Sequence, residues 1–429
     1  MSRNTNADIL KSQCIKIIHG IIPNSKNNEE IEDRQESIRV KLFNLLNDFH
    51  LNMVEISTRI EKDKIDIEQT FFSKSTLSRS PKIELVSSEA HHKGQRPCII
   101  TFDQEHKIVY KPRDLRIDSL ITGRQPNSLF QLISSIANEL NFPTYQFLNK
   151  KTEGYGYTTF LSHISKDYKL NMNEMKQYYR MIGAIQAVST VFGIQDLHRE
   201  NVIVHNKMPH LIDLEVSFNL HELINQNGVT GLDDTIAVAH DIQDTDKLTS
   251  NNVVLIKDNF EIDLSTHLND NYKEYRKEMV SGFKIVLDVF NNGNTQKTLL
   301  KFIDDLPGDL KLRFVPKQTR DLLPWALSQP LSKQDTMAEM LMDSQEGHLE
   351  YEQKDQIIGT QTKEDIIHSD IPYMHTNIEG NVYYKDVLFL QNKTGLKIKE
   401  LIKNNVLNSK KLSIDNFLHT LDIKYKLIG

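Results

Sequence analysis

The sequence predicts an α+β fold of two lobes, in which a small lobe rich in β-strands precedes a mostly helical lobe. Three observations support this prediction. Short runs of β-branched and aromatic residues gather between residues 82 and 111, and a long helical pattern occupies residues 173–192. A loop rich in polar side chains then leads into two short apolar runs that predict a hairpin.

The composition narrows the class of protein. The chain has 429 residues, 38% of them hydrophobic, and a net charge of −6 with both signs interspersed, which argues against a dominant nucleic-acid surface. The N-terminus lacks the apolar core of a signal peptide, and the longest apolar run is too short to cross a bilayer. Cys14 and Cys98 offer neither a disulfide framework nor a cysteine-rich zinc site. We expect a soluble cytoplasmic protein without a membrane span.

The first elements form the N-terminal region and the smaller lobe. Residues 1–80 are expected to be helical, because apolar side chains recur there at three- and four-residue steps. Residues 81–152 are expected to form the small, strand-rich lobe. Its predicted strands are residues 82–86, 98–102 and 107–111. A helix should follow at residues 127–141, with Asn127 or Ser128 as its cap.

The remaining elements form the larger lobe, residues 153–342, and a C-terminal region. The segment "EGYGYTTFL" is expected to open the lobe as an extended hinge. The helix at residues 173–192 should end at Gly193. The stretch "DLHRENVIVHNKMPHLIDLE", which begins at Asp196, then supplies a loop and a hairpin. Residues 343–429 are expected to be a helical region after a polar loop.

This loop and hairpin carry the residue types of a kinase-type magnesium site. Asp196 and Asn201 are five residues apart, and Asp213 follows the second predicted strand. In kinases one Asp accepts the proton of the substrate hydroxyl, and an Asn and a second Asp hold magnesium against the nucleotide phosphates. Lys111, at the end of the third strand, suits a phosphate oxygen. Each residue alone has an ordinary explanation at a solvated strand end, but their order and spacing favour the kinase interpretation.

One feature of that template is missing. No G-x-G-x-x-G motif precedes the second strand, and only Gly94 lies in the first strand connection. Histidines and cationic side chains surround this glycine. The loop could hold phosphates through its backbone N–H groups and these side chains.

Six motifs spread over most of the chain carry a further signal: "HHKGQRPCIITF", "YKPRDLRID", "GYGYTTFL", "DLHRENVIVHNKMPHLIDLE", "RFVPKQTR" and "SDIPYM". Together they resemble the dehydratase domain of class II lanthipeptide synthetases. The resemblance implies a protein/lipid-kinase-like core that phosphorylates Ser and Thr of a ribosomal precursor peptide with ATP and Mg²⁺. Elimination of the phosphate then leaves dehydroalanine or dehydrobutyrine.

The resemblance also assigns site residues. Seven match positions for nucleotide, metal or phosphoryl transfer: His91, Lys111, Asp196, His198, Asn201, Asp213 and Glu215. Asp196 and His198 are implied to be catalytic, and Asn201 and Asp213 to bind the metal. His91, Lys111 and Glu215 are implied to bind the cofactor.

A separate pair, Arg313 and Thr319, matches the positions that the family uses for elimination. Removing a Cα proton requires a base, and a guanidinium can stabilise the leaving phosphate. The sequence departs from the family at Glu89, where an Asp is usual, and at Lys317, where an Arg is common.

We therefore expect a stand-alone dehydratase, with a separate cyclase as a candidate partner, because two cysteines offer no site for the family's zinc-dependent cyclase. Two alternatives stay open: a peptide or protein Ser/Thr kinase that stops at the phosphorylated product, and a nucleotide- or peptide-binding pseudoenzyme. Arg313 and Thr319 favour elimination over the first alternative, and the complete magnesium set argues against the second.

Overall fold

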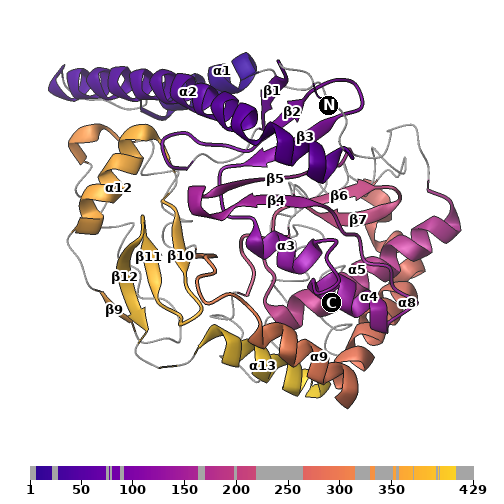
Figure 1. Cartoon of the computed structure of the whole chain (residues 1–429). Helices are drawn as coiled ribbons and strands as arrows, with labels where there is room; N and C mark the ends of the chain where they lie inside the picture. Colours follow the sequence, from indigo (N-terminus) through magenta and orange to yellow (C-terminus); the bar gives the residue numbers. More distant parts are fainter. Residues whose placement is uncertain are drawn as a thin grey trace.

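The structure is a computed structural model in which helices and sheets are mixed (Figure 1). It describes residues 6–21, 28–73, 77, 80–86, 91–162, 170–197, 201–218, 264–314, 329–333, 351–353, 357–370, 372–392, 395 and 397–411. No helix within these ranges is long and apolar enough to cross a membrane.

Two helices begin the described chain, as expected for its N-terminal region: α1 (Asn6–Ile21) and the 44-residue α2 (Asn28–Phe71). Apolar side chains of α2 pack on the first β-sheet. The carboxylate of Asp63, which is 1% exposed, accepts hydrogen bonds from the Tyr155 hydroxyl at 2.7 Å and the Tyr157 hydroxyl at 3.0 Å. This buried polar contact fixes α2 on the sheet at one point.

The first sheet has five antiparallel strands in the order β1-β2-β3-β5-β4. They are β1 (Lys82–Leu85), β2 (Cys98–Thr101), β3 (Lys107–Lys111), β4 (Phe147–Lys150) and β5 (Tyr155–Thr159). The three strands predicted from the sequence are confirmed as β1, β2 and β3. The segment expected to be a hinge is instead β5, so the sheet continues past residue 152. Tyr155 and Tyr157 account for this correction, because both rings are fully buried in the core of the sheet.

Helices make up most of the described residues in the middle of the chain. They are α3 (Arg116–Thr122), α4 (Leu129–Ile136), α5 (Met172–Phe192), α8 (Leu264–Asn291) and α9 (Gly293–Asp304). Ser128 caps α4, as the sequence predicts, but that helix already ends at Ile136 because Ala137 has a ψ of 79°. Asn171 and Glu174 form a capping box at the start of α5, and Gly193 ends it in the left-handed conformation, as predicted.

Helices α5 and α8 approach closely through two glycines. A Cβ atom at Gly183 would lie 1.9 Å from the carbonyl oxygen of Met279, and one at Gly282 would lie 1.8 Å from that of Arg180. Both obstacles are backbone atoms, so a side chain at either position would have to separate the helices. The largest hydrophobic core of the protein surrounds this crossing.

We expect Gly183→Ala to destabilise the protein by roughly 1–3 kcal/mol or more, because a well-packed core tolerates added methyl groups poorly. Gly293→Ala is the matched control, since a Cβ atom there meets nothing within 4 Å. Denaturant unfolding of the two variants measures the difference. Equal stabilities would contradict the close backbone approach of α5 and α8.

A second five-stranded antiparallel sheet has the order β8-β10-β11-β12-β9. Its strands are β8 (Leu312–Phe314), β9 (Tyr351–Gln353), β10 (Met374–Thr376), β11 (Val382–Tyr384) and β12 (Val387–Asn392). The structure thus corrects the expectation of a helical region after residue 343. That region does contain α12 (Ile357–His368) and α13 (Ile398–Asn408), but four short strands lie between and beside them. Their apolar side chains, among them the fully buried Tyr384 and Phe389, form a small core of their own.

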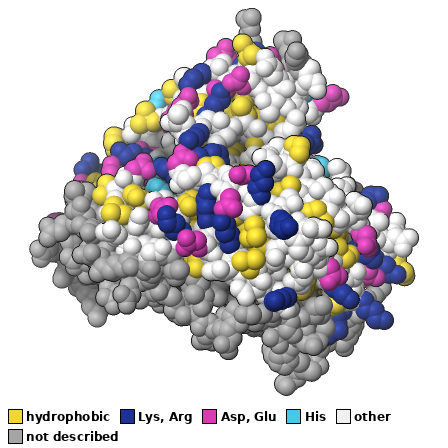
Figure 2. Space-filling view, turned by 60° about the horizontal axis from the view of Figure 1, so that its bottom comes forward, with side chains coloured by type: hydrophobic (Ala, Val, Ile, Leu, Met, Phe, Trp, Pro, Cys, Tyr) yellow, Lys and Arg dark blue, Asp and Glu magenta, His cyan; other side chains and the backbone are white. Residues whose placement is uncertain are grey.

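Charged side chains of both signs are mixed on the face shown in Figure 2. Among the coloured, described side chains of that face, no broad area carries a single sign. The view agrees with the interspersed charges of the sequence and its net charge of −6.

Candidate functional site

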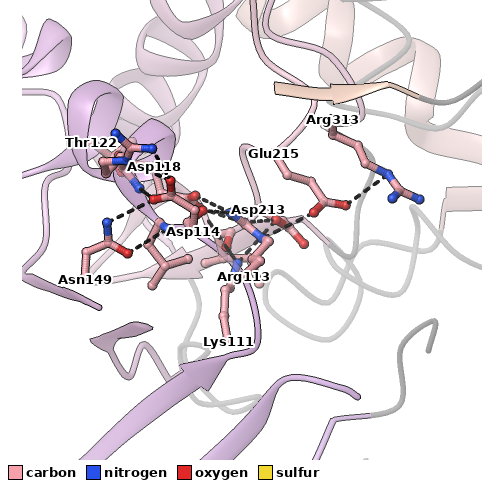
Figure 3. A network of polar contacts seen from close by, with 12 residues as sticks. Lys111, Arg113, Asp114, Asp118, Thr122, Asn149, Asp213, Glu215 and Arg313 are labelled. Atoms are coloured by element: carbon pink, nitrogen blue, oxygen red, sulfur yellow. Dashed lines mark hydrogen bonds and ion pairs between the residues drawn. The ribbon is translucent and has the colours of Figure 1, made fainter. Parts of the chain in front are cut away.

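Lys111, the last residue of β3, is buried in a network of charges rather than solvated, with only 6% of its surface exposed (Figure 3). Its Nζ lies 3.3 Å from Oδ1 of Asp213 and 3.8 Å from Oδ1 of Asp118, and it donates to the carbonyl oxygen of Ile212. The lysine therefore links the first sheet, α3 and the segment after the hairpin.

Arg113 is the second cation of this network. Its guanidinium makes a bidentate pair with Asp118, at 2.6 and 3.0 Å, and also donates to Oδ1 of Asp213. Its Nε lies 3.3 Å from Oε2 of Glu215. Arg113 and Asp118 were missed as site residues, although both belong to "YKPRDLRID". The signal was a second cation two residues after the strand-ending Lys111, with an acid five residues beyond it.

The turn between β3 and α3 is itself held by hydrogen bonds (Figure 3). Oδ1 of Asp114 accepts from the backbone N–H of Arg116 and from Nδ2 of Asn149, both at 2.9 Å. Oδ1 of Asn149 in turn accepts from the backbone N–H of Leu115 at 3.1 Å. These contacts to β4 fix the path of the chain from Lys111 into α3.

The two carboxyl groups after the hairpin, those of Asp213 and Glu215, have pKa values shifted in opposite directions. Burial alone would raise the pKa of Asp213, but the charges of Lys111 and Arg113 outweigh it and hold this pKa well below its ordinary value. Burial and the neighbouring Asp213 raise the pKa of Glu215, against the lowering effect of Arg313 and Arg113. Asp213 is thus ionised at neutral pH, whereas Glu215 takes up a proton more readily than an ordinary glutamate.

The predicted hairpin is confirmed as β6 (Val202–His205) and β7 (Met208–Leu211), joined by a two-residue turn. The backbone N–H of Ile212 donates to the carbonyl oxygen of Asn201 at 3.0 Å, so Asn201 lies beside the residue that precedes Asp213. Nδ2 of Asn201 donates to the carbonyl oxygen of Asp196 at 2.7 Å. The hairpin thus brings Asn201 and Asp213 to the same end, as their spacing predicts. His198 lies outside the described residues.

These residues fit a magnesium ion chemically. Asp213 is held ionised and Asn201 lies next to its segment across the hairpin, and both side chains offer oxygen, the ligand type that Mg²⁺ prefers. Magnesium needs only one or two protein ligands when phosphate oxygens and water complete its shell. Within the described ranges, no three His, Cys, Asp or Glu side chains are grouped so as to hold a metal.

Arg313, in β8, joins the same network from the second sheet (Figure 3). Its backbone N–H donates to the carbonyl oxygen of Glu215 at 3.0 Å, and its Nε lies 3.9 Å from Oε1 of that residue. The guanidinium carbon lies 4.0 Å from the centre of the Tyr373 ring. Glu215 therefore contacts both Arg113 and Arg313. Thr319, the predicted partner of Arg313, lies outside the described residues, as do Glu89 and Lys317.

The loop that carries His91 is held by an acid from the C-terminal region. His92, Lys93 and Gly94 have φ values of 50°, 65° and 77°, a run of left-handed residues of the kind that forms anion-binding backbone concavities. The backbone N–H groups of Lys93 and Gly94 both donate to the carboxylate of Asp370. The N–H of Gly94 lies 2.9 Å from Oδ1 of Asp370. The N–H groups expected to bind phosphate thus bind a protein carboxylate in this structure.

Asp370 is fully buried, and burial raises its pKa to about 7, against the lowering effect of the hydrogen bond from Gly94. Three residues further on, the ring of Tyr373 lies 5.3 Å from that of His91 and 5.2 Å from that of His92. Asp370 and Tyr373 belong to the motif "SDIPYM", which had suggested no individual role for either. Through Tyr373, His91 lies on the same side of the site as Arg313.

Comparisons with known proteins find similarity over part of this chain. Residues 40–253 match the family model described as "Domain of unknown function (DUF4135)", a range that includes Lys111 and Glu215 but not Arg313. Over 196 residues, the chain is 28% identical to "Lacticin 481/lactococcin biosynthesis protein LcnDR2" of Lactococcus lactis subsp. lactis. The match covers 45% of this chain and 20% of the relative, so the chain spans about a fifth of that relative's length.

Proposed function

We propose that this protein is a peptide dehydratase with a two-lobed kinase-like core. It would phosphorylate Ser and Thr of a ribosomal precursor peptide with ATP and Mg²⁺ and then eliminate the phosphate to give dehydroalanine or dehydrobutyrine. The observation that carries the proposal is the position of Glu215, which joins the Lys111, Arg113 and Asp213 network to Arg313. The similarity to a lacticin 481 biosynthesis protein supports a role in peptide modification.

In the first half-reaction, ATP–Mg²⁺ supplies the phosphoryl group and neutralises part of its charge. Lys111 binds a phosphate oxygen, and Asp213 and Asn201 hold the metal. Asp196 accepts the proton of the Ser or Thr hydroxyl. The low pKa of Asp213 supports its role, because a carboxyl group binds a metal in its ionised form.

In the second half-reaction, the Cα–H and Cβ–O bonds break, a C=C bond forms, and phosphate leaves with the electrons of the Cβ–O bond. Arg313 stabilises the leaving phosphate with its planar guanidinium. Glu215 contacts Arg313 and has a raised pKa, which makes it a better proton acceptor than an ordinary carboxylate. We assign the removal of the Cα proton to Glu215.

Incubation with ATP, Mg²⁺ and a small peptide encoded beside this gene tests the proposal by peptide mass. We expect the loss of one water per modified residue. A stable gain of phosphate would instead identify a kinase that stops at the phosphorylated product. An unchanged peptide despite nucleotide binding would identify a pseudoenzyme.

A further inference from the structure

The guanidinium of Arg313 is buried but poorly satisfied by hydrogen bonds. The residue is only 4% exposed, and its Nε and one terminal nitrogen have no hydrogen-bond partner among the described residues. The other terminal nitrogen donates to the carbonyl oxygen of Pro372 over a long 3.4 Å, and Glu215 lies 3.9 Å away. Because buried N–H groups are costly to leave unpaired, this guanidinium is suited to an anion that brings its own oxygens.

This guanidinium also lies over the face of the Tyr373 ring, with its carbon 4.0 Å from the ring centre. An aromatic face attracts a cation and fixes its plane without using its N–H groups. Stacking therefore orients Arg313 and leaves N–H groups available for a ligand. The Tyr373 hydroxyl contributes less, since it lies 3.4 Å from Oε2 of Glu215, which is long for a hydrogen bond.

Tyr373 is itself held from two sides. It directly precedes β10, whose Met374 pairs with Phe314 of β8, so the register of the two strands sets Tyr373 beside Arg313. The rings of His91 and His92 lie against the Tyr373 ring. Three residues before Tyr373, the carboxylate of Asp370 binds the loop that carries these histidines.

We propose that Tyr373 is a positioning residue for elimination. Its ring holds the guanidinium of Arg313 beside Glu215, so that unpaired N–H groups of the arginine receive the phosphate of the phosphorylated Ser or Thr. This inference rests on the proposed function, because it assigns the elimination step to Arg313. Phosphoryl transfer is expected to depend less on this stacking. Lys111 and Asp213 are fixed by Arg113 and Asp118, and Tyr373 reaches the residues assigned to the cofactor through His91.

The test compares Tyr373→Leu with Tyr373→Phe in the assay with ATP, Mg²⁺ and the neighbouring small peptide. The leucine removes the aromatic face, whereas the phenylalanine keeps it and removes only the hydroxyl. We expect Tyr373→Leu to slow elimination about tenfold to thirtyfold, the range that loss of a desolvated cation–π contact implies, so that phosphorylated peptide accumulates. Tyr373→Phe should eliminate within about threefold of the natural protein, because it keeps the aromatic face that orients Arg313.

Tyr383→Leu is the matched control, because Tyr383 is a half-buried aromatic of the same sheet that stacks on His375 rather than on Arg313. Damage to the sheet alone would make this control accumulate phosphopeptide as well, and would overturn the inference. A Tyr373→Leu protein that dehydrates without accumulating phosphopeptide would overturn it too, while the proposed function stands. So would a Tyr373→Phe protein that behaves like Tyr373→Leu.

A chemically synthesised phosphopeptide of the same sequence separates the two claims. If the natural protein neither phosphorylates the peptide nor eliminates from the phosphopeptide, the proposed function fails, and the inference fails with it. If it eliminates and Tyr373→Leu has an unchanged kcat and KM for elimination, only the inference fails. If Tyr373→Leu misfolds, it loses phosphorylation as well as elimination. The rates of elimination by Tyr373→Phe and Arg313→Met then show whether an aromatic ring without the hydroxyl is enough to support the role of Arg313.

Discussion

Asp213→Asn is expected to abolish measurable modification of the peptide, with phosphoryl transfer slowed by about a hundredfold to a thousandfold, as when one preorganised charge is removed from an active site. The substitution keeps the shape of the side chain but removes its charge, and an amide is a poorer magnesium ligand than a carboxylate. The rates of appearance of phosphorylated and dehydrated peptide measure the effect. Both products should fall together, because elimination requires the phosphorylated residue.

The fold should survive this change. Lys111 keeps Asp118 at 3.8 Å, and Arg113 keeps both hydrogen bonds to Asp118. Asp309→Asn is the matched control, since Asp309 is a more exposed carboxylate whose pKa is lowered to about 2 by hydrogen bonds from Lys151 and Arg116. The control should retain activity. Normal phosphorylation by Asp213→Asn would remove Asp213 from the metal site.

Arg313→Met is expected to give the opposite pattern, with phosphorylation retained and elimination slowed about a hundredfold or more. Methionine fills much of the same volume and can lie against the Tyr373 ring, but it offers the leaving phosphate no charge or N–H group. The stable product should be a peptide that carries phosphate. Peptide mass over time measures the ratio of phosphorylated to dehydrated residues.

Lys311→Met is the control for this substitution. Lys311 precedes β8 and pairs with the exposed Asp386 at 2.5 Å. Its substitution by methionine removes one positive charge, as Arg313→Met does, but two residues away from Arg313. We expect this variant to dehydrate the peptide normally. Unchanged dehydration by Arg313→Met would exclude Arg313 from the elimination step.

Much of the candidate site was accessible from local patterns in the sequence. Lys111 ends a short β-branched run, and the spacing of Asn201 and Asp213 predicted that a hairpin brings them together. Such features depend on a few neighbouring residues. In the structure Lys111 ends β3, and the hairpin brings Asn201 and Asp213 to the same end, as expected. Tyr373 was missed because an aromatic residue before a strand has no distinctive local pattern, and Arg113 because a cation after a strand is usually solvated.

The second sheet shows the same limit for the fold. Its strands are three to six residues long and lie among polar segments, so their apolar pattern was too short to outweigh the helical signals around them. Strand β8 also precedes its neighbour β10 by some sixty residues of sequence, and their pairing depends on packing rather than on a tight turn.

The sequence alone was enough for elements that depend on neighbouring residues: the end of α5 at Gly193, the β6–β7 hairpin and the first three strands. Only the tertiary structure could decide which charges meet. The guanidinium of Arg113 binds Asp213 across 100 positions of sequence, and the backbone N–H of Lys93 donates to the carboxylate of Asp370 across 277. Side-chain type limits what each residue can pair with, but the choice among many possible partners follows from how sheets and helices pack, and burial then makes each pairing strong.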